Sequence, residues 1–372
     1  MFNTSSVCAV NFQARALCAQ TASKEKHRFI VGTCSLHDNN ELSVLQYSED
    51  SNHFDSVNVY GHSDQIWALE ASPKDPSLVV SSRQSNRGFK SVTLWKMPNQ
   101  EPDDIISDSA VTYASDLLEL QEKATFNQSQ KSSFVHTIKW HRSQEQLLTL
   151  DNQILTAWNI TPTHITQSNA FILGFEEGNN NDQIRRGGSI SWDPHAPTNC
   201  AAAYGDSIQF IDTRDMEVSL TKREAHDGNI RDIDYNPNKP FTLVTAGDDR
   251  KIKFWDMRKP EKPIVVLSGH SHWVWTTRYN PYHDQLVLSG GSDNIVNLWR
   301  IASCSSAPWL GMEDSGDEDP PNIRVRAIDH HEDSIYSVAW SPADAWIYCS
   351  LSLDGRAIIN HVPSTEKYKI LL

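Results

Sequence analysis

The sequence predicts an all-β fold built from repeated four-stranded units, and three observations lead to this prediction. Two segments, 226–255 and 270–299, carry one pattern in the same register. Short runs of alternating apolar and polar residues recur between turn residues, whereas long stretches of helical period are absent. The chain has 12 Trp, 16 Gly and 17 Pro among its 372 residues, a composition that favours short strands and many turns.

The pattern in the two segments is a His followed at fixed distances by Pro, Asp and Trp. In both copies Pro comes 11, Asp 23 and Trp 29 residues after the His, and the copies start 44 residues apart. A fixed period of this length indicates that each unit is one supersecondary element. The residues concerned are His226, Pro237, Asp249 and Trp255 in the first copy and His270, Pro281, Asp293 and Trp299 in the second.

The same spacing organises the N-terminal half of the chain. Residues 29–36 and 41–47 alternate like two strands of a divergent first unit, with an inner strand expected just before them. A second unit starts at His62 and ends at Trp95. Residues 98–130 are expected to form a polar excursion between blades that includes an outer strand.

Five more units complete the chain. A third ends at Trp158, a fourth has Ile211 where Trp is expected, and the two clear copies are the fifth and sixth. Residues 303–322 are acidic and poor in apolar groups, which predicts a flexible insertion before the last blade. The seventh unit starts at His331, and its last segment, KYKILL, is expected to be an outer strand.

Seven four-stranded units around an axis make a seven-bladed β-propeller, which the sequence predicts as a single domain over residues 1–372. Radial repetition leaves few free sheet edges, and the ring closes where the chain termini meet. The sequence leaves open whether an N-terminal or a C-terminal strand completes the closing blade.

The repeated polar residues predict a buried hydrogen-bond network in each blade. The imidazole, the Trp N–H and a Ser or Thr hydroxyl on the second strand are expected to satisfy one another, with the Asp orienting the imidazole. The predicted members are His226, Thr245, Asp249, Trp255, His270, Ser289, Asp293, Trp299, His331, Ser350 and Asp354.

Catalytic and metal-binding interpretations of these residues are weaker. Ser289 with His270 and Asp293 has the composition of a catalytic triad, but the same constellation repeats from blade to blade and serves structure. His270, His272 and His283 lack a carboxylate or thiol at ligand spacing. We therefore expect no enzymatic activity, no metal and no cofactor.

The functional surface is expected where the repeats differ. Because side chains alternate along a strand, residues three and five positions after the His face one side and residue four faces the core. Residue four is uniformly β-branched: Ile66, Ile230, Val274 and Ile335. The candidate partner-binding face consists of Trp67, Asn229, Arg231, Trp273, Trp275 and Tyr336. Trp, Arg and Tyr dominate interface hot spots, so binding is favoured over packing between blades.

Charge, cysteine content and hydropathy argue against a nucleic-acid-binding protein, a disulfide-linked protein and a membrane-spanning protein. A net charge of −14 disfavours a phosphate backbone as partner, so no nucleic acid is expected. Six scattered cysteines fit reduced thiols in a cytoplasmic protein. No apolar run reaches membrane-spanning length, so direct membrane insertion is not expected.

The spacing of His, Asp and Trp resembles the WD-repeat propellers, and the chain as a whole resembles one family of them, the EARP- and GARP-complex-interacting proteins. Residues 98–183 match that family poorly. The matching segments are FQARAL, FIVGTCSL, IWALEASP, RDIDYNPNKP, KFWDMR, HSHWVW, SLSLDGRAIINHVP and KYKILL.

The resemblance implies a non-enzymatic adaptor that binds multisubunit tethering complexes of endosomes and the trans-Golgi network. Such an adaptor supports endosomal recycling, retrograde traffic and secretory-vesicle maturation. The expected partners are subunits of EARP and GARP, with the chain present as a monomer within the larger complex. It would be cytoplasmic and peripherally recruited to these membranes.

A second resemblance gives the alternative function. FWDMR and FIDTR are similar to the WDxR motif of substrate receptors in cullin-RING ubiquitin ligases, in which Arg258 and Arg214 would contact the ligase adaptor. Each Arg also has a structural interpretation, a local salt bridge on the rim of its blade. The tether adaptor is therefore the favoured function.

Overall fold

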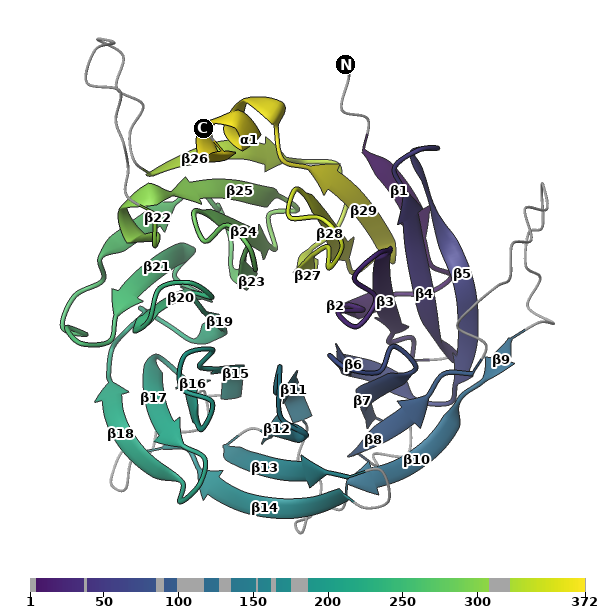
Figure 1. Ribbon diagram of the computed structural model, residues 1–372, viewed down its shortest axis with the longest axis horizontal. Coiled ribbons are helices and arrows are strands. Elements are labelled where there is room, and N and C mark those ends of the chain that lie inside the picture. Colours follow the sequence, from purple (N-terminus) through teal and green to yellow (C-terminus); the bar gives the residue numbers. More distant parts are fainter. Residues whose placement is uncertain are drawn as a thin grey trace.

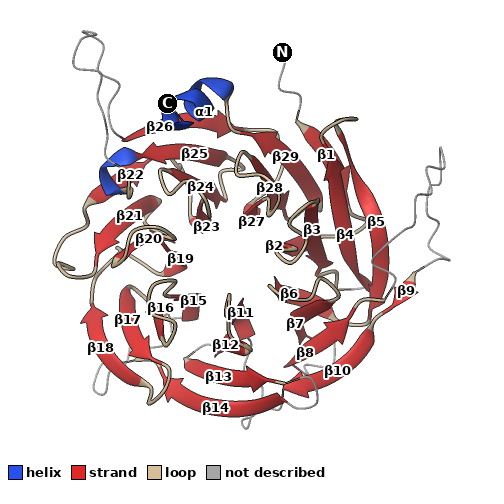
Figure 2. Ribbon diagram, in the orientation of Figure 1, coloured by secondary structure: helices blue, strands red, loops and turns tan. Residues whose placement is uncertain are grey.

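Seven antiparallel sheets form a ring around a central axis, which confirms the predicted seven-bladed propeller (Figure 1). Strands make up almost the whole ring, and the short helices lie at its outer side (Figure 2). This computed structural model describes residues 5–36, 39–84, 90–98, 117–126, 135–151, 153–161, 165–174, 187–307 and 322–371.

The first four blades follow one another along the chain, each with its innermost strand first. Blade 1 consists of β2 (Ala14–Ala19), β3 (His27–Thr33), β4 (Asn40–Ser48) and β5 (His53–His62), and blade 2 of β6 (Gln65–Ala71), β7 (Leu78–Gln84), β8 (Lys90–Lys96) and β10 (Gln121–Phe126). Blade 3 consists of β11 (Val135–Trp140), β12 (Gln146–Asp151), β13 (Ile154–Ile160) and β14 (Ile165–Ile172), and blade 4 of β15 (Gly187–Trp192), β16 (Asn199–Tyr204), β17 (Ser207–Asp212) and β18 (Glu217–Lys222).

The last three blades contain the best-preserved repeats. Blade 5 consists of β19 (Ile230–Tyr235), β20 (Thr242–Gly247), β21 (Lys251–Asp256) and β22 (Val265–Ser268), and blade 6 of β23 (Val274–Tyr279), β24 (Leu286–Gly291), β25 (Val296–Ile301) and β26 (Asn322–Ile328). Blade 7 consists of β27 (Ile335–Trp340), β28 (Ile347–Ser352), β29 (Arg356–His361) and β1 (Ser6–Ala9). A 3₁₀ turn, η1 (Ala302–Cys304), follows β25.

The N-terminal strand closes the ring. β1 pairs antiparallel with β29, with Ser6 opposite Ile359 and Ala9 opposite Arg356. The expected outer strand in KYKILL is wrong, because Ser364–Leu371 is the helix α1. The edge of β29 is already taken by β1, and the carbonyl of Pro363 accepts hydrogen bonds from the first turn of the helix.

Helix α1 is anchored on blade 6 by a buried ion pair. Nη1 of Arg300, a fully buried residue of β25, lies 3.0 Å from Oε2 of Glu366, which is 5% exposed. Lys367 packs over the ring of Trp346 at 5.3 Å from its centroid. The C-terminal segment therefore clamps blades 6 and 7 instead of extending a sheet.

Both predicted excursions interrupt a blade before its outermost strand. The segment 98–130 leaves blade 2 after β8 and returns through β9 (Leu118–Glu119) and β10, and β9 pairs parallel with β5 of blade 1. The acidic segment 303–322 separates β25 from β26 in blade 6. Residues 99–116, 127–134 and 308–321 lie outside the described residues.

The blades pack through the residue in position four of each repeat. Ile66, Ile230, Val274 and Ile335 are all fully buried. Two of them lie against a glycine of the preceding blade, where an added Cβ would come within 2.5 Å of Ile66 at Gly32 and 2.6 Å of Ile335 at Gly290. A β-branched side chain therefore fills the space that glycine leaves at these junctions.

Blades 5 and 6 carry the hydrogen-bond network that their spacing predicts. In blade 5, His226 Nδ1 lies 2.8 Å from Asp249 and its Nε2 lies 2.7 Å from the Thr245 hydroxyl, which accepts from Trp255 Nε1 at 2.9 Å. Blade 6 repeats these contacts with its own residues, including a 2.8 Å contact between His270 Nε2 and Ser289. The geometry fits a neutral imidazole that donates from Nδ1 and accepts at Nε2.

Blade 7 differs at two points. His331 contacts Ser350 through Nε2, but its Nδ1 contacts the hydroxyl of Ser352 at 2.7 Å, and that hydroxyl donates to Asp354. The expected direct contact between His331 and Asp354 is thus replaced by one through a serine. Asn360, in the place of Trp, is buried, and among the described residues its amide nitrogen has no hydrogen-bond partner.

The network in blade 5 predicts a specific loss of stability. Thr245→Val keeps the shape but leaves the Trp255 N–H and His226 Nε2 without a buried partner, which should lower the free energy of unfolding by roughly 2 to 4 kcal/mol. Urea denaturation at pH 7 measures it. Thr276→Val is the matched control, because that buried hydroxyl makes no hydrogen bond in the described structure. Equal losses in the two variants would contradict the role of the network.

The buried histidines predict a pH dependence of stability. Burial lowers the pKa of His62 and of His331 to about 4, whereas an unfolded His titrates near 6.5. Between these values the unfolded chain binds the extra protons, so stability falls as pH falls. Urea denaturation at pH 7 and pH 5 should show a loss of roughly 2 kcal/mol for each of the two histidines. Equal or higher stability at pH 5 would contradict this assignment.

Candidate functional site

The inner strands enclose a central channel with a volume of about 790 Å³. Residues from the inner strands of all seven blades line it. These strands surround the axis of the ring (Figure 1). Residues in position five of the repeats lie near the mouth at which the inner strands begin. This mouth is the candidate site.

Arginine and aromatic side chains contact one another in a row along this mouth. The guanidinium of Arg15, from β2, lies between two rings, with Cζ 4.5 Å from the centroid of Trp67 and 4.6 Å from that of Tyr336. Tyr336 is stacked at a tilt on Trp275, with ring centroids 5.0 Å apart. The guanidinium of Arg231 lies 4.6 Å from the Trp275 centroid.

We call these five residues, Trp67, Arg15, Tyr336, Trp275 and Arg231, the arginine–aromatic row. They come from the inner strands of blades 2, 1, 7, 6 and 5, which are consecutive around the ring. All five line the channel, and each keeps part of its surface exposed. Cation–π contacts of this kind stabilise an arrangement by roughly 0.5 to 2 kcal/mol each, depending on desolvation.

Polar contacts fix the orientation of the row. Trp275 Nε1 donates to Ser292 at 2.5 Å, and Trp67 Nε1 donates to Gln65 at 3.1 Å. Arg231 forms a two-pronged ion pair with Asp248, at 2.6 and 2.8 Å. Rings and guanidinium held in this way lose little side-chain entropy when a partner binds.

Two predicted face residues lie beside the row and outside the channel lining. Trp273 is 41% exposed, and its ring meets that of Trp275 edge to face with centroids 5.8 Å apart. Asn229 donates to Asp248 at 3.1 Å and so supports the ion pair of Arg231. The other four predicted residues belong to the row itself.

Sequence reasoning missed Arg15 and Asp248. Blade 1 has no His, so the spacing could not place Arg15. Alignment of the buried Ala14 with Ile66 and Ile230 would have found it, because Arg15 then falls on Trp67 and Arg231. Asp248 lies in the turn just before Asp249, the Asp of the repeat. The repeat pattern does not include position 248, so it gave no reason to expect that Asp248 pairs with Arg231.

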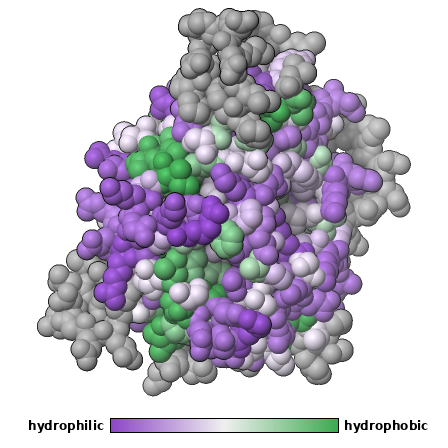
Figure 3. Space-filling view, turned by 60° about the vertical axis from the view of Figure 1, so that its left-hand side comes forward, coloured by the Kyte–Doolittle hydropathy of each residue, from purple (hydrophilic) through white to green (hydrophobic). Residues whose placement is uncertain are grey.

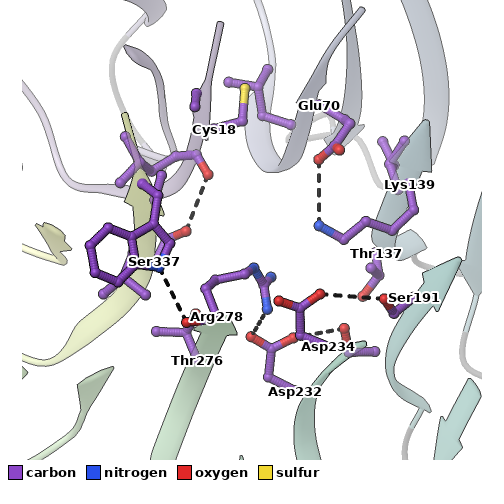
Figure 4. Close-up of a pocket in the computed structure, with 18 of the residues that line it drawn as sticks. Cys18, Glu70, Thr137, Lys139, Ser191, Asp232, Asp234, Thr276, Arg278 and Ser337 are labelled. Carbon is purple, nitrogen blue, oxygen red and sulfur yellow. Dashed lines mark hydrogen bonds and ion pairs between the residues drawn. The ribbon is translucent and has the colours of Figure 1, made fainter. Parts of the chain in front are cut away.

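Deeper in the channel, opposite charges meet across blades (Figure 4). Lys139 Nζ lies 3.6 Å from Glu70, and Arg278 donates to Asp232. Asp234 accepts hydrogen bonds from the Ser191 hydroxyl and from the backbone N–H of Tyr279. Burial raises the pKa of Asp234, although the charge of Arg278 opposes this rise.

Below the row, the channel lining mixes charges of both signs. The carboxylates Glu70, Asp232 and Asp234 lie there with Lys139 and Arg278, and Lys24 and Arg142 line the same channel. The channel is positive and aromatic at the row, whereas an anion that goes further also meets carboxylates.

The triad-like residues of blade 6 do not form an accessible site. Ser289 is fully buried and His270 is 8% exposed, and the serine oxygen is engaged by the Trp299 N–H. Of the histidines considered as metal ligands, His272 packs on Trp273 and His283 stacks on Trp346. Within the described ranges, no three His, Cys, Asp or Glu side chains come together as a metal site.

The two arginines of the WDxR-like motifs are paired locally. Arg258 Nη2 lies 2.6 Å from Asp256, and Arg214 Nη2 lies 2.6 Å from Asp212, in each case an Asp two residues earlier. Their side chains are 60% and 71% exposed. These ion pairs account for both residues without a partner, and at this exposure they contribute little to stability.

The surface shown in Figure 3 is mostly hydrophilic, with hydrophobic side chains in small separate patches among the coloured atoms. Single exposed apolar residues of this kind are normal for a folded protein. Of the helices in the described part of the chain, none has the length and apolar character needed to cross a bilayer.

Comparison with known proteins gives the relatives of the chain. A family model described as EIPR1 beta-propeller matches residues 2–299, and a WD domain, G-beta repeat model matches residues 322–359. The chain is 33% identical over 393 residues to EARP and GARP complex-interacting protein 1 of Homo sapiens and 35% identical over 396 residues to EARP-interacting protein homolog of Gekko japonicus, with 98% of each chain covered. WD repeat-containing protein DWA2 of Arabidopsis thaliana is 30% identical, with 95% of each chain covered.

The family match extends over most of the propeller, and the relatives cover nearly the whole chain. The same residues that build the blades therefore build the matched domain. The chain belongs to the EARP- and GARP-complex-interacting family of WD-repeat β-propellers.

Proposed function

We propose that this protein is a non-catalytic WD-repeat adaptor that binds the EARP and GARP tethering complexes through the arginine–aromatic row. The identity of the partner is supported by the names of full-length relatives, which describe proteins that interact with these complexes. In this role the protein supports endosomal recycling, retrograde traffic and secretory-vesicle maturation. It is cytoplasmic and reaches endosomes and the trans-Golgi network through its partner.

The observation that carries the choice of surface is the row itself. Five large side chains from five consecutive blades are held at one mouth by one ion pair, two hydrogen bonds from Trp N–H groups and contacts between arginines and rings, while they keep exposed area. Buried anchors of Trp, Tyr and Arg supply most of the binding energy in protein interfaces. A partner segment seated on the row would cover all five at once, with the protein as a monomer in the complex.

The partner is a protein rather than a nucleic acid. The net charge of −14 opposes a phosphate backbone, and the cations at the mouth are few and held against rings. The alternative function, a substrate receptor of a cullin-RING ligase, needs Arg258 or Arg214 to exchange its local Asp for a partner. That exchange makes it the less favoured of the two functions.

Removing the tryptophans of the mouth should weaken binding to the tether. Trp273→Ala combined with Trp275→Ala deletes two rings and the ring face on which Arg231 packs, so affinity for purified EARP should fall at least roughly 10-fold. Surface plasmon resonance with the immobilised complex measures the affinity. Tyr368→Ala, which removes an exposed aromatic side chain from α1, should bind like the unmodified protein.

The alternative function gives its own prediction. Arg258→Ala breaks only an exposed ion pair with Asp256, so neither the melting temperature nor EARP binding should change measurably. Arg258→Ala and the Trp273→Ala, Trp275→Ala variant are each tested for co-precipitation with EARP subunits and with a cullin adaptor. The pattern of losses separates the tether adaptor from the ligase receptor. Loss of a cullin adaptor in Arg258→Ala, with EARP binding retained, would support the ligase receptor instead.

A further inference from the structure

Three basic residues that line the described part of the channel are each paired with a carboxylate, whereas Arg15 is not. Arg231 pairs with Asp248, Arg278 with Asp232 and Lys139 with Glu70. Among the described residues, no carboxylate pairs with the Arg15 guanidinium, whose Cζ lies 4.5 Å from the Trp67 centroid and 4.6 Å from that of Tyr336. Arg15 is partly exposed, so its guanidinium is accessible and available to pair with an anion from a partner.

The surroundings of Arg15 make its charge costly in the unbound protein. Burial lowers the pKa of Arg15, and the positive charge of Arg231 lowers it further. The ring centroids of Trp67 and Tyr336 lie within 4.6 Å of the guanidinium carbon, and among the described residues its N–H groups have no carboxylate partner. The N–H groups of a guanidinium match the two oxygens of a carboxylate.

The channel below limits how far an anion can enter. Glu70, Asp232 and Asp234 lie below the row and repel an anion that enters further, so a carboxylate is favoured at the depth of the row, beside Arg15 and Arg231. The Trp275 and Trp273 rings lie next along the mouth and provide apolar surface for the residues flanking that carboxylate. The site is therefore built for an acidic residue with apolar neighbours.

We propose that Arg15 binds the carboxylate of an Asp or Glu side chain in a protein partner, while apolar residues beside that acid pack on the rings of the row. This deepens the proposed function, since it rests on the same mouth and names the chemistry of the segment that docks there. The acid pairs with a guanidinium that has no carboxylate partner among the described residues, and the Trp67 and Tyr336 rings already contact that guanidinium.

The test uses the full chain and a phage-displayed library of random 12-residue peptides as the probe. Selection on the unmodified protein should enrich sequences with a Glu or Asp next to an aromatic or aliphatic residue. A synthetic copy of an enriched peptide with Glu→Gln or Asp→Asn should bind roughly 10- to 100-fold more weakly by fluorescence polarisation, because the charged pair at Arg15 is lost. This comparison requires no change in the protein.

Variants of Arg15 complete the test. Arg15→Met keeps the stem between the rings and should weaken the acidic peptide by the same factor while binding its Gln or Asn copy unchanged. Arg15→Lys keeps the charge without the planar fork and should give an intermediate affinity. Arg258→Ala, an exposed arginine outside the mouth, is the matched control and should bind both peptides like the unmodified protein.

Several results would overturn the proposal. Enrichment of basic or purely apolar peptides would identify another occupant, and the absence of any enriched acidic sequence would show that the site does not form. Equal binding of the acidic peptide and its Gln or Asn copy would show that the carboxylate does not contribute to binding. If Arg15→Met binds the acidic peptide as tightly as the unmodified protein does, Arg15 does not bind the carboxylate.

The outcome is separable from that of the proposed function. If EARP binds the Trp273→Ala, Trp275→Ala variant normally while acidic peptides still require Arg15, the tether uses another surface and the carboxylate site stands. If EARP binding depends on the tryptophans but no peptide requires Arg15, the proposed function stands and the carboxylate site is wrong.

Discussion

The burial of one apolar residue at the start of the inner strands is the constraint on which the rest of the structure depends. Burial of Ile66, Ile230 and Ile335 between blades fixes which side of the strand faces the core at that point. The pairing register with the second strand shifts at the next residue, Trp67, Arg231 or Tyr336, and this bulged residue lines the channel. A shift of one residue would exchange the two sets, so packing of the propeller and assembly of the row are one event.

This constraint separates the residues that hold the blades from those that a partner meets. Blades 5 and 6 share the buried network of His, Asp, Trp and hydroxyl with nearly the same distances. At the mouth they differ, with Arg231 in one blade and Trp275 in the other. The network keeps the inner strands in register, and the variable position next to the core residue is free to carry the chemistry of recognition.

The sequence predicted the seven blades and most of the mouth because both follow from spacing. It did not predict features that depend on residues outside the repeated His, Asp and Trp pattern. Arg15 lies in a blade with no His, and the pairing of β1 with β29 joins segments at opposite ends of the chain. Helix α1 depends on Arg300, 66 residues before Glu366, which no local pattern reveals. The serine between His331 and Asp354 depends on side-chain reach inside a buried cluster.

Site-specific photo-cross-linking tests the central claim most directly. A benzophenone side chain placed at Trp273, at the rim of the mouth, is compared with one at Tyr368 on α1, since both positions are exposed in the free protein. The account predicts that the probe at position 273 cross-links to a subunit of purified EARP and that the probe at position 368 does not. Cross-links from position 368 alone would place the partner away from the mouth and contradict the account.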